Sequence, residues 1–312
     1  MPTFSVIIPC WNAARTLGAT LASVQAQTFG DFEVIIVDDG SQDDTVEIAR
    51  PIVESDARFR LVRQANGGPS RARNAAAFEH ATGTYIAFLD ADDLWVPYKL
   101  ARCAQVLTQP GDRRDVLYGR IGFFRETPDD VETFSRVVPD VLTALDLIGE
   151  NAVCTMSNVV VSRECFLRSG GFDPAVVHGE DVEWLIRLAI HGARIEAIDE
   201  LLVFYRASDA GLSADFPAMR QGWQVALDAA RRAGLEPNPT EVAAAEAIHL
   251  RYLARRALRV ASRRGTALKL AVEAIGRSPS GYFSDTRRGL LILAGAVCDA
   301  VLPAALFPTR RR

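Results

Sequence analysis

Four short strand-like runs, separated by segments with helical spacing, constrain the fold of this 312-residue chain most strongly. The runs cover residues 4–8, 32–37, 58–62 and 85–89. The first, second and fourth are largely apolar and β-branched or aromatic, as buried strands are, and the third, which contains two arginines, is expected to be a short strand. Helices are expected over about residues 13–27, 44–54 and 70–80, the first capped by Asn12. This alternation is typical of a parallel, doubly wound α/β sheet flanked by helices.

Carboxylates follow the second and fourth runs. They are Asp38 and Asp39 after the second, and Asp90, Asp92 and Asp93 after the fourth. Because parallel strands end at one edge of a sheet, these acids are expected where such sheets bind ligands. Neighbouring carboxylates repel one another, and an oxygen-bound divalent cation that also holds phosphates would relieve this repulsion. The alternative is that Asp92 or Asp93 caps a helix beginning at residues 96–97.

Five motifs in register resemble one known family. They are SVIIPCWN at 5–12, VIIVDDGSQDDT at 34–45, NGGPSRARNAA at 66–76, YIAFLDADDLW at 85–95, and GGFDP with HGEDVEWLIRLA at 170–174 and 178–189. In this order they resemble the family 2 glycosyltransferases, which have a GT-A type, Rossmann-like fold with a mostly parallel sheet. The resemblance covers roughly residues 3–215. It predicts a glycosyltransferase domain at 1–215 and an added helical, basic region at 216–312.

The resemblance implies a nucleotide-sugar site built from the first four motifs. Its expected donor-binding residues are Pro9, Trp11, Asn12, Asp39, Arg73 and Asp90. The ring of Trp11 would stack on the nucleobase, and Asp39 would accept hydrogen bonds from the base or ribose. Arg73 would contact the diphosphate or order the acids, because its planar fork binds two oxygens at once. The alternatives are a core position for Trp11, turn chemistry for Asp38 and Asp39, and a solvated Arg73.

Asp90-Ala91-Asp92 matches the DxD motif of the family. The resemblance implies that Asp92 contacts Mn²⁺ or Mg²⁺, which neutralises the leaving nucleoside diphosphate. Asp93 would be a cap or would support the metal ligands. Trp95 would line the donor or acceptor sugar site, or belong to the core. Ser208 stands where the family often has a His that reaches the metal, which leaves a third protein ligand unassigned.

The catalytic base implied by the resemblance is Asp181, at the start of a helix expected over 182–189. It would take the proton from an acceptor hydroxyl. Glu180 would orient the acceptor or a loop. The alternative is that Glu180 and Asp181 are acids favoured by the helix dipole. Residues 111–156, where the family places acceptor contacts, contain an expected strand at 116–124 and no assignable site residue.

The C-terminal part is basic. From Arg220 onward there are 16 Lys and Arg against 7 Asp and Glu. Arg251, Arg255, Arg259 and Arg263 recur every four residues and predict a basic amphipathic helix at a membrane surface, or the solvated face of a packed helix. The apolar run 289–307, interrupted by Asp299 and Pro303, predicts an interfacial or hairpin-like anchor instead of a full span.

The resemblance implies an inverting, metal-dependent glycosyltransferase that moves a sugar from a nucleoside-diphosphate donor to a hydroxyl, and family frequency makes uracil the expected donor base, that is, a UDP-sugar. The expected acceptor is a glycan or a lipid-linked intermediate of cell-surface polysaccharide synthesis. A catalytically silent nucleotide-sugar-binding or scaffold protein is the alternative. No nucleic-acid motif occurs, and five Cys without a CxxC pair fit a reducing cytoplasm, with peripheral contact to the membrane.

Overall fold

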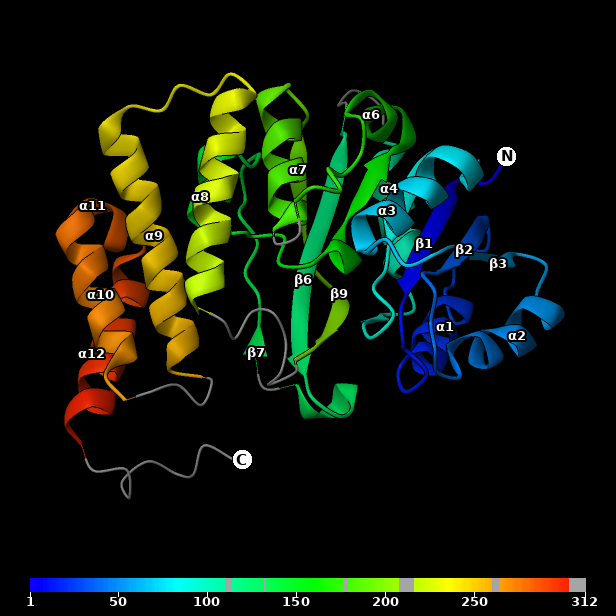
Figure 1. Ribbon diagram of the computed structural model, residues 1–312, viewed down its shortest axis with the longest axis horizontal. Coiled ribbons are helices and arrows are strands. Elements are labelled where there is room, and N and C mark those ends of the chain that lie inside the picture. The colour runs from blue at the N-terminus through cyan, green and yellow to red at the C-terminus, as the bar shows by residue number, and fades with distance from the viewer. Residues whose placement is uncertain (110–113, 132, 177–178, 208–215, 260–263, 303–312) are drawn as a thin grey trace. The chain divides into compact units, whose positions relative to one another are not determined.

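The computed structural model describes residues 1–302 except 110–113, 132, 177–178, 208–215 and 260–263 (Figure 1). The chain divides into two compact units. One comprises residues 1–142 and 152–208, and the other comprises 143–151 and 209–312. A short segment between two strands of the sheet, which includes helix α5 (Ala144–Gly149), therefore groups with the C-terminal helices. The boundary expected at residue 215 does not include this insertion.

The first four strands form the parallel sheet that the sequence predicts. They are β1 (Phe4–Cys10), β2 (Phe32–Asp38), β3 (Phe59–Arg63) and β4 (Tyr85–Phe88). They lie in the order β3-β2-β1-β4, and all three ladders are parallel. The intervening helices are α1 (Leu17–Gln25), α2 (Thr45–Ser55) and α3 (Pro69–Ala75), the last continued by a π-helical turn at Ala76–His80. The carboxyl ends of β1, β2 and β4 therefore share one edge.

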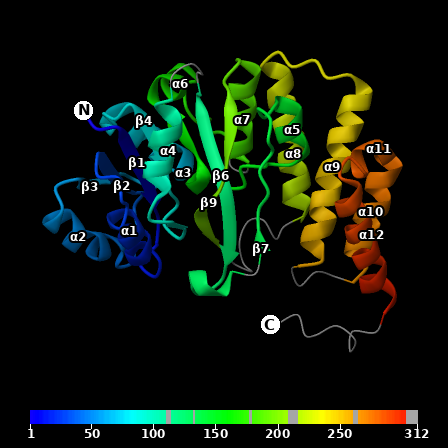
Figure 2. The ribbon, with the colours of Figure 1, turned by 180° about the vertical axis from the view of Figure 1, so that it is seen from behind.

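The sheet continues beyond β4 as a mixed sheet (Figure 2). The further strands are β5 (Leu94–Trp95), β6 (Val116–Phe124), β7 (Thr133–Phe134), β8 (Val160–Ser162) and β9 (Ile195–Arg206). Strand β8 pairs antiparallel with β4 and β6, whereas β6 and β9 run parallel. The remaining helices of this unit are α4 (Lys99–Leu107), α6 (Arg163–Arg168) and α7 (Glu180–Ile190). Short 3₁₀ turns cover Pro128–Asp130 and Met156–Asn158.

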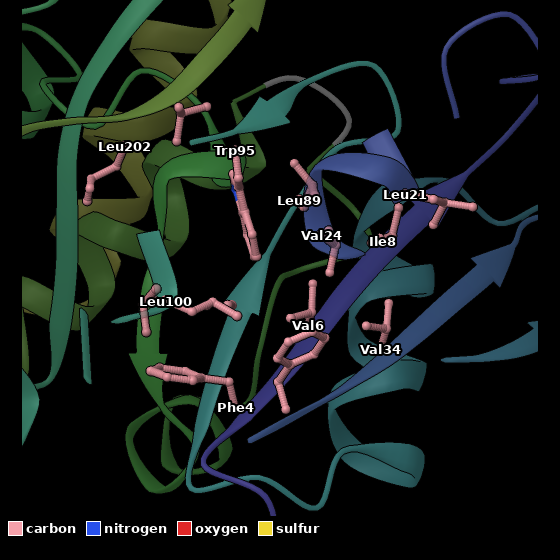
Figure 3. Packing of buried hydrophobic residues seen from close by; sticks show 14 of the residues in the cluster. Phe4, Val6, Ile8, Leu21, Val24, Val34, Leu89, Trp95, Leu100 and Leu202 are labelled. Carbon is pink, nitrogen blue, oxygen red and sulfur yellow. The ribbon is translucent and has the colours of Figure 1, made fainter. Parts of the chain in front are cut away.

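The core of this unit lies against β1, which is buried along nearly its whole length. Figure 3 shows Phe4, Val6 and Ile8 packed beside Leu21 and Val24 of α1. Strands covered on both faces read as continuous apolar runs, and this is why the first and second runs were recognisable in the sequence. The packing fixes the strand ends and therefore the positions of the acids that follow them.

Two expected helix starts are wrong. Asn12 does not cap a helix, because it has a positive φ of 50° and helix α1 begins at Leu17. Its backbone N–H instead donates to Ser41 Oγ at 3.0 Å, which ties the loop after β1 to the loop after β2. Neither Asp92 nor Asp93 caps a helix at 96–97, because strand β5 intervenes and α4 begins at Lys99.

The second unit consists of helices. Besides α5 they are α8 (Phe216–Arg232), α9 (Pro239–Ala257), α10 (Thr266–Arg277), α11 (Pro279–Tyr282) and α12 (Thr286–Val301). Its core is rich in Ala, with Leu250, Leu253 and Tyr282 among the larger buried side chains. Small side chains let helices approach closely. None of the described helices combines the length and hydropathy that crossing a bilayer requires.

The predicted basic stripe on α9 is not an exposed surface. Arg251 is 4% exposed and donates from Nη1 to the backbone oxygen of Tyr282 at 2.7 Å. Arg255 Nη2 lies 3.4 Å from Glu150 Oε1. Helix α9 ends at Ala257, so the pattern does not continue as a helix through Arg259. Arg263 lies outside the described residues. The prediction failed because partners inside the unit draw the first two arginines inward.

Candidate active site

The loop after β2 is held by its two acids. Asp38 is fully buried, accepts a hydrogen bond from the backbone of Ser41 at 3.1 Å and pairs with Arg63 Nε at 3.2 Å. It therefore has the turn-holding role that was one of its alternatives. Asp39 accepts from Gln64 Nε2 at 2.7 Å and from the backbone N–H groups of Gly67 and Gly68 at 2.9 and 2.7 Å.

Asp39 thus anchors the Gly-rich turn in front of α3. Gly68 has a φ of 85°, a conformation that side chains other than Gly rarely adopt. A carboxylate offers about four acceptor positions, and three bonds leave room for one more donor. The carboxylate of Asp39 therefore fixes this turn. A further contact from Asp39 to a base or ribose stays a prediction.

Trp11 projects from the same edge. Its side chain is 59% exposed, so the core alternative for this residue is wrong. Pro9 lies inside β1 opposite Val37, and Asn12 Oδ1 accepts from the backbone N–H of Gln42 at 2.8 Å. These contacts fix the loop that carries Trp11. Stacking of its ring on a nucleobase stays a prediction.

The acids after β4 are organised by two hydroxyl side chains that the sequence analysis missed. Asp93 is 1% exposed and accepts from Ser157 Oγ at 2.6 Å and from Thr155 Oγ1 at 3.4 Å. Its other oxygen accepts from the backbone N–H of Arg206 at 2.9 Å. Asp93 is therefore a buried support of the site. Thr155 and Ser157 lie just before β8, the neighbour of β4, and no sequence motif marks them.

Asp90 contacts the hydroxyl groups of Thr155 and Ser157 on one side and the buried guanidinium of Arg73 on the other. Its backbone N–H donates to Ser157 Oγ at 3.0 Å, and Oδ2 accepts from Thr155 Oγ1 at 3.1 Å. Its Oδ1 lies 2.6 Å from Arg73 Nη2. The carboxylate is therefore held on both oxygens before any ligand arrives.

Arg73 connects the acid edge with helix α7. It is 5% exposed, which excludes the solvated alternative. Its Nη1 lies 3.3 Å from Glu180 Oε1, and the guanidinium lies 5.5 Å from the ring centroid of Phe172. Glu180 is therefore an ion-pair partner of Arg73. Since Glu180 directly precedes Asp181, one cation links the DxD motif to the predicted base.

Three carboxyl groups at this site have strongly raised pKa values. Partial burial and then the charge of Asp90 raise the pKa of Asp92 to about 6, although its side chain reaches the surface. Burial and then the charge of Glu180 raise the pKa of Asp181 to about 6. Burial and the neighbouring acids also raise the pKa of Asp93. The site holds more negative charge than its own cations offset.

The remaining predicted residues divide between core and undescribed segments. Trp95 is 3% exposed and donates from Nε1 to the backbone oxygen of Ser157 at 2.8 Å, so the core alternative holds for this residue. Ser208 lies outside the described residues. Among the residues that the structure describes, no group of three or more His, Cys, Asp or Glu side chains could hold a metal ion. A metal here would need ligands from the substrate and water.

Comparisons with known proteins place this chain in a family. The model for "Glycosyl transferase family 2" matches residues 5–167. Uncharacterized glycosyltransferase EpsJ of Bacillus subtilis (strain 168) is 30% identical over 224 residues, 68% of this chain and 63% of that protein. The UDP-Glc:alpha-D-GlcNAc-diphosphoundecaprenol beta-1,3-glucosyltransferase WfgD of Escherichia coli is 30% identical over 72% of this chain and 85% of that protein. The match spans less than two thirds of the first curated relatives.

Solved structures match the fold. S. aureus TarS 1-349 in complex with UDP-GlcNAc has a TM-score of 0.62 at 19% identity, covering 96% of this chain and 89% of that one. Mannosyltransferase PcManGT from Pyrobaculum calidifontis, in complex with GDP-Man and Mn2+, has a TM-score of 0.54 at 23% identity, covering 96% and 87%. The expected GT-A fold with an added helical region is confirmed. By its motifs, its sheet and these matches, the chain belongs to glycosyl transferase family 2.

Proposed function

We propose that this protein is an inverting glycosyltransferase that moves a sugar from a nucleoside-diphosphate sugar to an acceptor hydroxyl. One observation carries the proposal: Arg73 lies within 2.6 Å of Asp90 and 3.3 Å of Glu180, the neighbour of Asp181. This arrangement puts a fixed positive charge between the DxD acids and a carboxyl group with a pKa of about 6. A silent binding protein has no need for a carboxyl group poised to titrate near neutral pH.

The donor would bind along the shared strand edge. Trp11 offers an exposed aromatic face for the base, and Asp39 has one acceptor position left beside the Gly-rich turn. Asp90, already held by Arg73 and Thr155, would present its remaining acceptor capacity to ribose or to a metal-bound water. Pro9 and Asn12 would shape the pocket through the loop they fix.

Asp92 fits a divalent cation. Its carboxylate reaches the surface, forms no ion pair within the described residues, and has a raised pKa that a nearby cation would lower. Carboxylate, phosphate and water oxygens are the ligands that Mg²⁺ and Mn²⁺ prefer. When bound, the ion would neutralise charge on the diphosphate as the glycosidic bond breaks. Asp93, buried among Ser157 and Thr155, would hold the loop that presents Asp92.

Asp181 would act as the general base. At pH 7 a carboxyl group with a pKa of about 6 is mostly ionised, yet basic enough to take a proton from a hydroxyl as its oxygen attacks the anomeric carbon. The new C–O bond would form as the bond to the diphosphate breaks on the opposite face, so an α-linked donor would give a β-linked product. Glu180, paired with Arg73, would hold the start of α7 in place.

The substrate class follows from similarity alone. The name of WfgD gives a UDP-sugar donor and a diphosphoundecaprenol-linked acceptor, and TarS was solved with UDP-GlcNAc. We propose a UDP-sugar donor and a glycan or lipid-linked acceptor in cell-surface polysaccharide synthesis. A lipid-linked acceptor would bring the protein to the cytoplasmic face of the cell membrane.

The test is release of nucleoside diphosphate from a panel of sugar nucleotides with Mn²⁺ or Mg²⁺, with and without a membrane extract as the source of acceptor. Wild type should turn over one donor, and both Asp181→Asn and Asp92→Ala should abolish the signal. Donor binding without turnover, even with the extract, would favour the silent binding protein. Absence of binding to every sugar nucleotide would refute both.

A further inference from the structure

The outer face of α12 is apolar and exposed. Its exposed side chains include Leu290 at 55%, Leu291 at 64%, Val297 at 43% and Val301 at 72%. These positions fall on one side of a helix with 3.6 residues per turn, and the opposite side, which includes Ile292 and Ala296, is buried in the unit core. Contiguous apolar surface of this kind marks a contact with something apolar.

The one acid of this helix does not interrupt the face. Asp299 is 8% exposed, and its Oδ2 accepts a hydrogen bond from the backbone N–H of Gly265 at 3.2 Å. In the sequence, Asp299 interrupts the apolar run 289–307, and a charge there disfavours burial in lipid. The structure turns that carboxylate toward the start of α10. The exposed face therefore has no negative charge.

Each end of the face carries an exposed arginine. Arg287 lies in the first turn of α12, on the same side as Leu290 and Leu291. At the other end, Arg264 donates from Nε to the backbone oxygen of Asp299 at 3.1 Å, and it also bonds the backbone oxygen of Leu302. Positive charge thus flanks the apolar side chains on both ends.

We propose that the exposed face of α12 docks on the surface of an anionic lipid bilayer, with the helix axis in the membrane plane. A helix of 16 residues is about 24 Å long, shorter than a hydrocarbon core of about 30 Å, so it lies in the interface instead of crossing it. Lipid phosphates would meet Arg287 and Arg264 while the apolar side chains enter the acyl boundary.

Charge favours a bilayer over a second copy of this chain as the occupant. Two-fold pairing of α12 in an antiparallel arrangement would bring Arg287 of one copy toward Arg264 of the other, with no acid on the face to separate them. An anionic surface complements both ends at once. This proposal assigns the membrane contact to α12, within the apolar run 289–307, in place of the α9 arginine stripe, and does not depend on the transferase activity.

The experiment is co-sedimentation of the full chain with vesicles of phosphatidylcholine alone or with about 30% phosphatidylglycerol. The test variant is Leu291→Glu/Val297→Glu. The control is Ile48→Glu on α2, a side chain that is 40% exposed. Wild type and the control should bind the anionic vesicles, more weakly in high salt, and the double variant should bind at least about tenfold more weakly. Far-UV circular dichroism and thermal melts verify that all three are folded.

Three results would overturn the proposal. The first is that wild type fails to bind the anionic vesicles, and the second is that the double variant binds as well as wild type. The third is that light scattering finds a wild-type dimer that the double variant converts to a monomer, without vesicle binding, which would assign the face to self-association. No donor is present, so failure here leaves the transferase proposal standing.

Discussion

Arg73 Nη2 lies 2.6 Å from Asp90 Oδ1, which joins the first helix after the Gly-rich turn to the acid after β4. The other terminal nitrogen of the same guanidinium lies 3.3 Å from Glu180. A lysine is a single point of charge and cannot make both contacts with this geometry. The donor side and the base side of the site therefore share one buried cation.

Replacing Arg73 should lower kcat/KM by more than any loss of folded protein accounts for. We expect Arg73→Gln to lower kcat/KM by about 10²–10³-fold and Arg73→Lys by at least about tenfold. Because Arg73 also lowers the pKa of Asp181, loss of its charge should shift the pH–rate profile to higher pH. The control is Arg168→Gln, which removes a surface pair with Glu164 at 2.8 Å. A normal kcat/KM for Arg73→Gln would contradict this reading.

The rate should rise with pH through about 6. Asp181 accepts a proton only when ionised, and burial with the charge of Glu180 raises its pKa to about 6. Activity should therefore be low at pH 5 and level off above pH 7.

Protonation of Asp92, with a pKa also near 6, should raise the metal concentration needed for activity at low pH. A pH series at saturating and limiting Mn²⁺ separates the two effects, and a flat profile at saturating Mn²⁺ would argue against Asp181 as the base.

The same raised pKa predicts a stability difference. An Asp with a pKa near 3.9 in the unfolded chain and about 6 in the folded protein holds more protons when folded, so stability falls as pH rises between these values. Asp181→Asn carries no charge at any pH. Without ligand, the variant should be more stable than wild type by about 1–2 kcal/mol above pH 6, after allowance for solvent screening. The two should converge near pH 4. Urea melts at both pH values test this, and equal stability at pH 7.5 would refute it.

The sequence predicted the elements that repeat a simple pattern. The first two strands, β1 and β2, are apolar runs buried along almost their whole length, and the strand expected at 116–124 matches β6. Failures came where tertiary contacts override local signals. Asn12 has a good capping side chain, but its backbone bond to Ser41 holds it outside the helix. The spacing of Arg251 and Arg255 indicated a surface stripe, yet the backbone oxygen of Tyr282 and the carboxylate of Glu150 bind them inside the unit.

The candidate site was predicted only in part for the same reason. Motifs gave the acids and Arg73 because each follows directly on a strand end or a Gly-rich turn. Thr155 and Ser157 reach the acids only because β8 pairs with β4, across more than sixty residues of chain. Such a contact depends on sheet order, which local spacing does not contain.

Ser157 offers a test of that hidden support. Its hydroxyl donates to Asp93 at 2.6 Å and accepts from the backbone N–H of Asp90 at 3.0 Å. Ser157→Ala leaves two buried polar groups short of a partner and should lower the free energy of unfolding by about 1–3 kcal/mol. It should also lower kcat/KM by at least about tenfold, because the DxD loop loses its support.

The matched control for Ser157 is Ser162→Ala. Ser162 caps α6 by accepting from the backbone N–H of Cys165 at 3.1 Å. Loss of this cap should cost about 1 kcal/mol of stability and leave kcat/KM of the folded enzyme unchanged. If both variants lose stability and neither loses activity, Ser157 is a structural residue only.

Glu150 should stabilise the helical unit by pairing with two arginines. Its Oε1 lies 2.7 Å from Arg288 and 3.4 Å from Arg255. Burial lowers the pKa of Arg259, and repulsion by Arg288 adds to this effect, so the region carries an excess of positive charge. Glu150→Gln keeps the shape but removes the charge that separates these arginines. We expect the free energy of unfolding to fall by about 1–3 kcal/mol, seen as faster hydrogen exchange in α9 and α12.

The control for Glu150 is Glu273→Gln, which breaks one pair with Arg220 at 2.6 Å and should lower the free energy of unfolding by less than about 1 kcal/mol. Equal effects of the two substitutions on exchange would show that Glu150 is one more surface ion-pair partner and not the charge that holds the unit together.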